Sequence, residues 1–536
     1  MCSTYFLKDG FGSLVAEVYI GKTIFITGGS GFLGRVLIEK ILRKSPDVKH
    51  IYMLLRPKKG KDPRQRVEEL FNSPLFDLLK IMRGEEITKK VSCVAGDVME
   101  PGLGLMEIVF HGAATIRFDE PLRKAVLLNT RGTKYTLELA KEMKKLLVSI
   151  LFKVEGRGIV SHLPFINLKS KIDQHFFVLS YRILENFPNS YAYTKNLSEG
   201  LVVEFTEAGL PAMILRPSIV IPVWKEPLPG WTDNINGPTG LLIGAGKGVI
   251  RTMYCNNKGY ADYLPVDICV NGILLAGLRT EYMPSNFESR VANLLAEIID
   301  VGKDIVTSDV PLNGGIWYPG GSMKTSRFLH NICVVLFHWI PAYFLDAIIF
   351  LSGNKPVLCR VHDRVNKGFE VFEYYANNQW EFRNEHVHYL RKILNKRERF
   401  EYKIDGEDMD IRGYFMNCVM AARIFILKEM PESLPSAKRH MLLDRATFLP
   451  QVKQILFGGP VLLSRTNSRV VKLCAGYTLK FPSISDQMVT SAHHLPSNFF
   501  GLQNLMVDDG AVGLILHLIS TNRAYFTLIS STRCFN

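Results

Sequence analysis

Residues 22–34 constrain the fold of this chain more than any other part of the sequence. The apolar run at 24–26, Ile-Phe-Ile, is too short for a helix and predicts a buried strand of a parallel sheet. Glycines follow at Gly28, Gly31 and Gly34, and apolar residues recur with helical spacing over 32–43. These glycines allow a tight turn, backbone approach to a pyrophosphate and close packing of a helix on a strand. The segment therefore predicts a dinucleotide-phosphate site.

Three more strands are expected, at residues 50–55, 91–95 and 108–110. The first of them ends in Arg56, where dinucleotide-binding domains often place a carboxylate that binds the ribose hydroxyl of NAD. A basic residue there, followed by lysines at 58, 59 and 61, favours the 2′-phosphate of NADPH, with a solvated basic loop as the alternative. Asp97 follows the next strand and could hold the adenine edge. Small residues at 112–114 suit close approach by a nucleotide.

Strands that alternate with helical patterns predict an α/β fold with a doubly wound parallel sheet. One connection does not fit this pattern. Around residues 105–107, before the strand at 108–110, there is no room for a separating helix. Because a βαβ crossover needs at least about 10–12 residues, a parallel crossover is not expected there.

Composition narrows the class of protein. With 536 residues, 47% hydrophobic and 22% charged, the chain can form two or three globular domains. Its nine cysteines include no CxxC pair, so we expect neither a disulfide framework nor a metal site, and a reducing compartment is favoured. The first 20 residues lack the apolar core of a signal peptide, so the catalytic domain is expected in the cytosol.

The formal charge of +14 does not indicate nucleic-acid binding, because the basic residues are spread along the chain without a recognised binding motif. An anionic membrane surface and phosphate-bearing substrates explain the excess more simply. We therefore expect no nucleic acid among the partners.

A second motif lies at residues 189–199, Asn-Ser-Tyr-Ala-Tyr-Thr-Lys-Asn-Leu-Ser-Glu. Tyr191 and Lys195 are four residues apart, so a helix places them on one face. An ammonium group beside a phenol lowers the pKa of the phenol, which can then donate a proton to a carbonyl oxygen as hydride arrives from a nicotinamide. Alone, this common spacing indicates a surface helix. Behind a glycine-turn domain it indicates a catalytic pair.

Several long strings resemble the alcohol-forming fatty acyl-CoA reductases, which are extended short-chain dehydrogenases. They are residues 21–34, 118–122 (Phe-Asp-Glu-Pro-Leu), 215–219 (Leu-Arg-Pro-Ser-Ile), 224–231 (Trp-Lys-Glu-Pro-Leu-Pro-Gly-Trp), 236–240 (Asn-Gly-Pro-Thr-Gly) and 244–248 (Gly-Ala-Gly-Lys-Gly). Residues 317–321 and 336–429 resemble the carboxyl-terminal domain of that family.

The resemblance implies reduction of a long-chain acyl-CoA by NADPH to an aldehyde, with release of CoA, and then to a primary alcohol. It implies that Tyr191 donates the proton and that Lys195 tunes it and holds the ribose. Cofactor contacts are expected at Gly28, Gly31, Phe32, Leu33, Gly34, Arg56, Asp97 and Lys195. Lys247 and Arg251 are candidates for contact with the CoA phosphates.

The chain departs from the family at the end of the fifth strand, where a Ser or Thr helps to polarise the substrate carbonyl. Residues 153–156, Lys-Val-Glu-Gly, stand where that string is expected, and the nearby Ser149 and Ser161 lie outside the pattern. Loss of an oxyanion donor typically lowers the rate by about 10²–10³. A catalytically silent homologue that binds NADPH is therefore one alternative, and a sugar-nucleotide or sterol dehydrogenase of the same superfamily is another.

The expected domains are an extension at 1–20, a reductase domain at 21–279 that is atypical at 147–187, a connecting segment at 280–322, a helical membrane-associated domain at 323–430 and a tail of unknown role at 431–536.

Residues 328–351 are apolar and long enough to cross a bilayer. The run includes His330, His338, Pro341 and Asp346, and an Asp in hydrocarbon costs roughly 2.5–3.5 kcal/mol. One-sided or hairpin-like attachment is thus as consistent with the sequence as a span, and a helix pair packed inside the domain is a third interpretation. We expect association with the endoplasmic reticulum or peroxisome membrane, and the sequence leaves a homodimer open.

Overall fold

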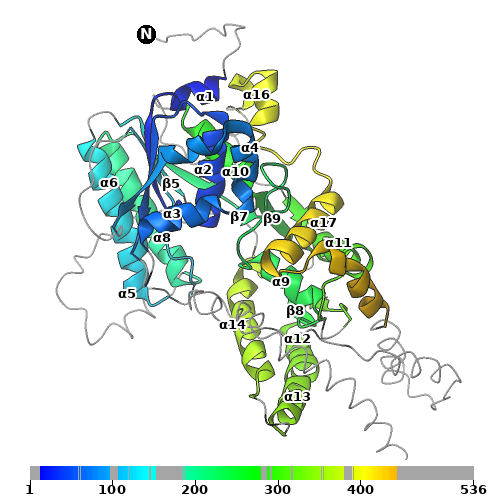
Figure 1. Ribbon diagram of the computed structural model, residues 1–536. Coiled ribbons are helices and arrows are strands. Elements are labelled where there is room, and N and C mark those ends of the chain that lie inside the picture. Colours follow the sequence, from blue (N-terminus) through cyan, green and yellow to red (C-terminus); the bar gives the residue numbers. More distant parts are fainter. Residues whose placement is uncertain are drawn as a thin grey trace, which may run out of the picture. The chain divides into compact units, whose positions relative to one another are not determined.

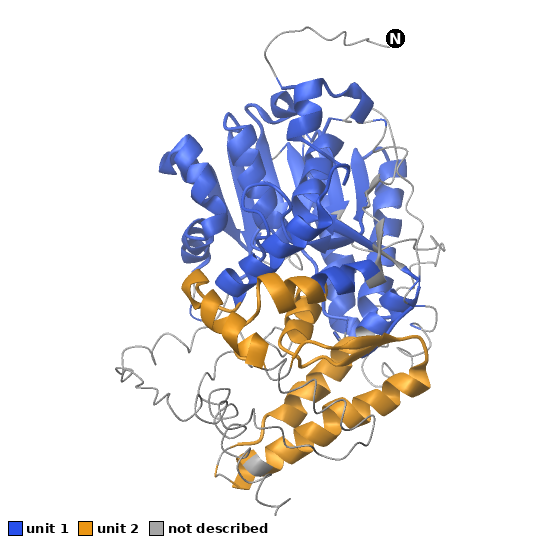
Figure 2. Cartoon of the chain, turned by 90° about the vertical axis from the view of Figure 1, so that its right-hand side faces the viewer, with its two compact units in different colours: residues 1–234, 254–302, 370–426 blue, residues 235–253, 303–369, 427–536 orange. Residues whose placement is uncertain are grey.

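The computed structural model describes residues 13–443 except 58–59, 61, 97–106, 119, 144–145, 153–183, 185–186, 257, 279–286, 290–291, 316–317, 352, 354, 379–388 and 390. The chain forms two compact units (Figure 2). The first comprises residues 1–234, 254–302 and 370–426, and the second comprises residues 235–253, 303–369 and 427–536.

The first unit is built on a sheet with strand order β10-β6-β5-β4-β1-β2-β3. Its strands are β1 (Thr23–Thr27), β2 (His50–Leu55), β3 (Val91–Ala95), β4 (Ile108–His111), β5 (Val148–Phe152), β6 (Ala212–Pro217) and β10 (Phe287–Ser289). The pairings within this sheet are parallel. The order reverses between β1 and β4, which is where a doubly wound sheet opens a crevice for a ligand. The predicted fold class is confirmed.

Helices cover both faces of this sheet (Figure 1). On one face α2 packs against α10, and on the other α6 packs against α8. The bounds are α1 (Leu14–Tyr19), α2 (Phe32–Lys44), α3 (Pro63–Phe71), η1 (Pro74–Phe76), α4 (Asp77–Arg83), η2 (Glu85–Lys90), α5 (Leu122–Ala125), η3 (Val126–Arg131), α6 (Gly132–Glu142), α8 (Ser190–Glu207) and α10 (Val266–Ala276). The main core lies between the sheet and the α2 face, around Ile24, Ile26, Leu37, Ile51 and Val270.

A late part of the chain completes this core. Leu394, Tyr402, Tyr414 and Cys418 belong to the same buried cluster as Ile24. The Tyr414 hydroxyl donates to Pro222 O at 2.7 Å. The elements concerned are α16 (Lys396–Glu401), α17 (Ile411–Ala421) and η6 (Ala422–Ile426), which accompany a small sheet of β7 (Ile219–Ile221), β9 (Tyr260–Pro265) and β11 (Ala292–Leu294).

The connection from β3 to β4 corrects one expectation. A parallel crossover was not expected there, but β4 pairs in parallel with β1 and so joins the same sheet as β3. Residues 96–107 make the connection, and most of them lie outside the described residues. An extended segment of this length spans up to about 40 Å, whereas three strand spacings amount to about 14 Å. The crossover therefore needs no helix.

The second unit contains α9 (Pro238–Gly246), η4 (Ile305–Asp309), η7 (Pro431–Ser433) and a two-stranded sheet of β8 (Thr252–Tyr254) and β12 (Ser322–Lys324). α11 (Leu295–Asp304) is divided between the units: residues 295–302 belong to the first and residues 303–304 to the second. The described part of the second unit also contains an antiparallel helical hairpin, residues 327–369, formed by one helical stretch and the first part of α14 (Figure 2). The stretch consists of α12 (Arg327–Val334), η5 (Val335–Trp339) and α13 (Ile340–Leu351), and α14 spans Leu358–Asn377.

Contacts along the hairpin fix its register. The rings of His330 and Phe369 meet at one end with centroids 6.2 Å apart. The rings of His338 and His362 stack in the middle at 5.1 Å. Near the turn, Asp346 Oδ1 accepts hydrogen bonds from the N–H groups of Val357 and Leu358, each at 2.9 Å. Asp346 thus satisfies the unpaired N–H groups at the start of α14.

Candidate functional site

The glycine turn between β1 and α2 has the geometry of a phosphate cradle. Gly28 has a φ of +77°, and a Cβ there would lie 2.7 Å from Ala113 N, so only glycine lets this turn touch the end of β4. A Cβ at Gly34 would lie 2.5 Å from Gly28 O, so glycine also lets α2 pack on the turn. Gly31 begins α2 without a side-chain cap, which leaves its first N–H groups facing an incoming anion. The turn fits the pyrophosphate of a dinucleotide.

Phe32 and Leu33, expected as cofactor contacts, use their side chains for packing. The Phe32 ring stacks on Trp231 with centroids 5.8 Å apart. Leu33 packs on the main core. These residues can therefore meet a cofactor only through the N–H groups of the first helical turn.

Three arginines gather around the glycine turn. Arg66 of α3 donates to Arg56 O at 2.9 Å and to Ser30 Oγ at 3.4 Å. The Arg35 Nε donates to Ser30 O at 3.1 Å. Burial lowers the pKa of Arg66, and the neighbouring charges of Arg56 and Arg35 lower it further. Arg56 was expected here from the sequence, whereas Arg35 and Arg66 were not, because only the fold brings α3 back to the turn.

The carboxyl ends of β1 and β4 meet beside the turn. Gly112 N donates to Thr27 O at 3.0 Å, and Ala113 N donates to Thr27 Oγ1 at 3.1 Å. His111, the last residue of β4, has its Nδ1 2.7 Å from Thr27 Oγ1. Burial, with a smaller contribution from the Lys195 charge, lowers the pKa of His111 to about 3. His111 is therefore neutral at neutral pH and links β1 to β4 through hydrogen bonds.

Tyr191 and Lys195 lie in α8, as predicted, and both are buried, with exposed fractions of 4% and 1%. The helix begins at Asn189, whose side chain accepts from Ala192 N at 2.8 Å. The Asn189 amide also donates to the Tyr375 hydroxyl at 2.9 Å. Phe118 packs edge-on against the Tyr191 ring, with centroids 5.6 Å apart. The start of α8 is therefore held on two sides, which fixes the position of the Tyr191 ring.

Asn129 is a site residue that sequence analysis missed. It lies in a π-helical turn, η3, and such turns are frequent at functional sites. Its Nδ2 donates to Thr194 Oγ1 at 2.9 Å, and its Oδ1 accepts from Thr115 N at 2.8 Å. Its backbone carbonyl accepts from Ser198 Oγ at 3.1 Å. Asn129 therefore ties α8 to the segment that follows β4, and its spacing in the sequence gave no sign of this.

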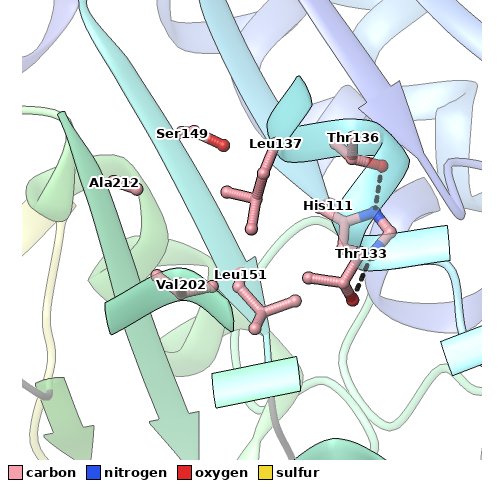
Figure 3. Close-up of a pocket in the computed structure, with 8 residues that line it drawn as sticks. All are labelled: His111, Thr133, Thr136, Leu137, Ser149, Leu151, Val202 and Ala212. Carbon is pink, nitrogen blue, oxygen red and sulfur yellow. Dashed lines mark hydrogen bonds between the residues drawn. The ribbon is translucent and has the colours of Figure 1, made fainter. Parts of the chain in front are cut away.

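Of the two serines considered in place of the expected donor, Ser149 and Ser161, Ser149 is the one among the described residues. Ser149 is the second residue of β5 and borders a small cavity of about 10 Å³ beside His111 and Leu137 (Figure 3). Because such a volume suits about one water molecule, the cavity cannot hold an acyl chain. Residues 153–156 and Ser161 lie outside the described residues, as does Asp97.

Lys247 and Arg251 lie in the second unit and have protein partners there. The Lys247 ammonium pairs with Glu429 at 3.2 Å. The Arg251 Nη1 donates to Tyr318 O at 2.6 Å, and burial lowers the pKa of Arg251. Their expected contact with CoA phosphates remains a prediction. Among the described residues, no group of three or more His, Cys, Asp and Glu side chains could hold a metal ion.

Comparison with known proteins places the chain in a family. Residues 26–273 and 337–429 match two family profiles, each described as male sterility protein. Fatty acyl-CoA reductase wat of Drosophila melanogaster is 34% identical over 460 residues, covering 79% of this chain and 87% of that protein. Fatty acyl-CoA reductase 1 of Mus musculus is 33% identical over 465 residues, covering 80% and 89%.

Among solved structures, a thiolation-reductase di-domain from an archaeal non-ribosomal peptide synthetase aligns with a TM-score of 0.48 and 13% identity, covering 78% of this chain and 81% of that one. The Rossmann-type domain with its glycine cradle binds a nicotinamide dinucleotide. With relatives above 30% identity along most of its length, this chain belongs to the fatty acyl-CoA reductase family.

Proposed function

We propose that the protein reduces long-chain fatty acyl-CoA to a primary fatty alcohol with NADPH, in two hydride transfers, and releases CoA after the first. The observation that carries this proposal is the buried pair Tyr191 and Lys195 on α8, in a chain that belongs to the reductase family. When bound, the nicotinamide supplies the hydride. Two equivalents of NADPH and two protons convert one thioester into one alcohol and one thiol.

The roles of the residues follow from their chemistry. The Tyr191 hydroxyl is the acid that donates a proton to the substrate oxygen, which gains negative charge as hydride reaches the carbonyl carbon. The Lys195 ammonium, one helical turn away, stabilises the tyrosinate left behind. The charge of Lys195 also acts on His111, and burial keeps that ring neutral, so His111 adds no second positive charge beside Lys195.

A preference for NADPH over NADH is supported by Arg35, Arg56 and Arg66. A ribose 2′-phosphate adds about two negative charges, and guanidinium groups recognise phosphate well. We expect Arg56→Ala to lower kcat/KM for NADPH by about tenfold or more and to leave that for NADH nearly unchanged. Arg64→Ala, in the exposed first turn of α3, is the matched control and should change neither value.

The reductase function is tested by gas chromatography of fatty alcohols from membranes that contain the chain, supplied with palmitoyl-CoA and NADPH. Removal of the Tyr191 hydroxyl in Tyr191→Phe should lower alcohol formation by about 10²–10⁴. Tyr193→Phe removes a hydroxyl two residues further along the same helix, where the ring contacts Phe187, and should retain activity. Alcohol formation that survives Tyr191→Phe would contradict the assigned role.

A catalytically silent homologue is the second candidate, supported by the residues found in place of the usual serine string. It predicts NADPH binding, seen as enhanced nicotinamide fluorescence, without alcohol formation by the unmodified chain.

We further propose that the protein is attached to the cytosolic face of the endoplasmic reticulum or peroxisome membrane. The helical stretch Arg327–Leu351, long and apolar enough to span a membrane, supports attachment.

A further inference from the structure

The first helical stretch of the hairpin turns its large apolar side chains outward. We call this surface the outer face and define it by Phe328, Phe337, Ile340, Tyr343, Phe344 and Phe350. The exposed fractions of these side chains range from 48% for Phe337 to 73% for Phe328. So many large exposed apolar groups on one helix are unusual for a protein surface in water and mark an interaction site.

Two polar residues in the later part of the same stretch, His338 and Asp346, point inward, whereas Arg327 and Asn331 near its start are exposed. His338 is fully buried, and its Nε2 accepts from Arg251 N at 3.0 Å. Asp346 is 7% exposed and accepts from the N–H groups at the start of α14. The helix is therefore arranged opposite to a helix that faces water, which turns its polar residues outward.

The other helix of the hairpin has an ordinary charged surface. Arg360, Asp363, Arg364 and Lys367 of α14 are exposed, and Lys367 pairs with Asp363 at 2.9 Å. Because His362 and Leu358 of α14 pack against the first stretch, a first stretch that crossed the membrane would carry α14 into it. A full span would place these charges in hydrocarbon, which is strongly unfavourable.

Basic residues flank the apolar surface. Arg327 begins the first stretch, and Lys355 and Arg360 lie at the turn and at the start of α14, all three exposed. A helix with an apolar face between basic residues suits the boundary between acyl chains and anionic headgroups. A second copy of this chain would bring the same basic residues together, so the charges favour lipid.

We propose that the outer face docks the protein on one leaflet of an anionic membrane, with the first stretch lying in the plane of the bilayer and α14 remaining in water. The inference deepens the membrane attachment proposed above and rests on it. It names the inserted surface and makes the attachment one-sided.

Flotation of the purified full chain with phosphatidylcholine vesicles, with and without about one-quarter phosphatidylserine, tests the docking. The unmodified chain should float with the anionic vesicles, and the double variant Phe337→Asp and Phe344→Asp should bind at least about tenfold more weakly. The control is Ile81→Asp with Met82→Asp, which removes two exposed apolar side chains from α4 and adds the same charge. It should float like the unmodified chain.

One-sided insertion is tested with Asp363→Cys and Lys367→Cys, each labelled on vesicle-bound protein by a membrane-impermeant maleimide and compared with the unmodified chain. Labelling without detergent is expected. Protection until detergent is added would show a span and overturn the proposal. Equal flotation of the Phe337 and Phe344 variant would also overturn it, as would a dimer of the unmodified chain that breaks in this variant without any lipid binding.

NADPH oxidation with a detergent-dispersed acyl-CoA separates this test from that of the proposed function. The Phe337 and Phe344 variant should keep the level of the unmodified chain while losing flotation. Tyr191→Phe should lose oxidation while keeping flotation. A folded far-ultraviolet circular dichroism spectrum is required of both.

Discussion

Asp267 and Asp346 perform the same task in two different regions of the molecule. Asp267, at the start of α10, accepts hydrogen bonds from Trp224 N and Lys225 N at 2.9 and 2.8 Å and a longer one from Glu226 N. Asp346, in the hairpin, accepts from Val357 N, Leu358 N and Cys359 N at 2.8–2.9 Å. Each carboxylate thus satisfies three successive backbone donors.

The two carboxylates nevertheless have opposite pKa shifts. Burial raises the pKa of Asp267, which is surrounded by the main core. Burial also acts to raise the pKa of Asp346, but the backbone donors at Cys359, Leu358 and Val357 outweigh it, and the pKa lies below its usual value. The hairpin is two helices thick, so it desolvates a charge less than the core of an α/β domain does.

The two regions also differ in the side chains that surround their buried charges. In the first unit, buried charges are paired, as Arg43 is with Glu39 at 2.6 Å and with Glu226 at 2.9 Å. In the hairpin, a buried Asp346 lies behind an outer face of exposed phenylalanines. Both regions hold a buried carboxylate by backbone donors, and they differ in the medium that their outer side chains suit.

The largest expected effect is a loss of NADPH affinity caused by a substitution in the nucleotide region, with the hairpin unchanged. Gly28→Ala places a Cβ 2.7 Å from Ala113 N at a φ of +77° and should weaken NADPH binding at least about 100-fold. Gly21→Ala is the matched control, because Gly21 has a φ of +67° but open space around it. Its affinity should be unchanged, with a stability cost of about 1–2 kcal/mol.

Fluorescence titration of NADPH checks this pair, and vesicle flotation checks the hairpin in the same preparations. Both variants should float like the unmodified chain. An equal loss of NADPH affinity in the two would show that backbone strain, and not the contact with β4, explains the effect.

A smaller effect compares the two carboxylates directly. Asp267→Ala leaves three N–H groups, that of Trp224 among them buried, without their acceptor at the edge of the core and should destabilise the protein by about 3 kcal/mol. Asp346→Ala should cost about 1–2 kcal/mol, because water reaches the start of α14 more easily. Urea unfolding followed by tryptophan fluorescence measures both. A larger loss for Asp346 would reverse the comparison.

The smallest expected effect is the pH dependence of the stability of the hairpin. A lowered folded-state pKa means that Asp346 contributes stability above the carboxyl pKa of the unfolded chain, about 4, and that this contribution is lost as the pH falls through the lower folded-state value. Asp267 has the opposite sign, because its raised folded-state pKa favours the protonated form as the pH falls.

Hydrogen exchange of the first turn of α14, corrected for intrinsic rates, should therefore show less protection at pH 3 than at pH 5. Asp346→Asn should remove most of that difference. An unchanged pH dependence in Asp346→Asn would assign the effect to another group.

The nucleotide region could be predicted closely from the sequence. β2 and β3 have the expected bounds, and α2 ends one residue beyond its own expected end at residue 43. Apolar periodicity and glycine spacing are local signals, so they can be read from the sequence. The parallel crossover before β4 was excluded wrongly, since residues 96–107 are long enough to connect the two strands without a helix.

Residues that act through tertiary contacts could not be predicted. Arg66 reaches the glycine turn from α3, and Asn129 contacts Thr194, 65 positions away in the sequence. The sequence also left open how residues 328–351 attach to a membrane, because apolar content does not reveal which side chains a partner helix covers. Asp346 looks like an interruption of an apolar run until its contacts with the start of α14 are known.

The contacts of the late core residues have a consequence for how the protein is made. The Ser13 hydroxyl, beside α1, donates to Glu398 Oε1 at 3.0 Å, and the Tyr414 hydroxyl donates to the backbone carbonyl of Pro222. During synthesis on the ribosome, the amino-terminal sheet therefore lacks part of its interior until more than 400 residues have been translated. Nascent chains that stop earlier expose this apolar interior, so they need a chaperone to remain in solution.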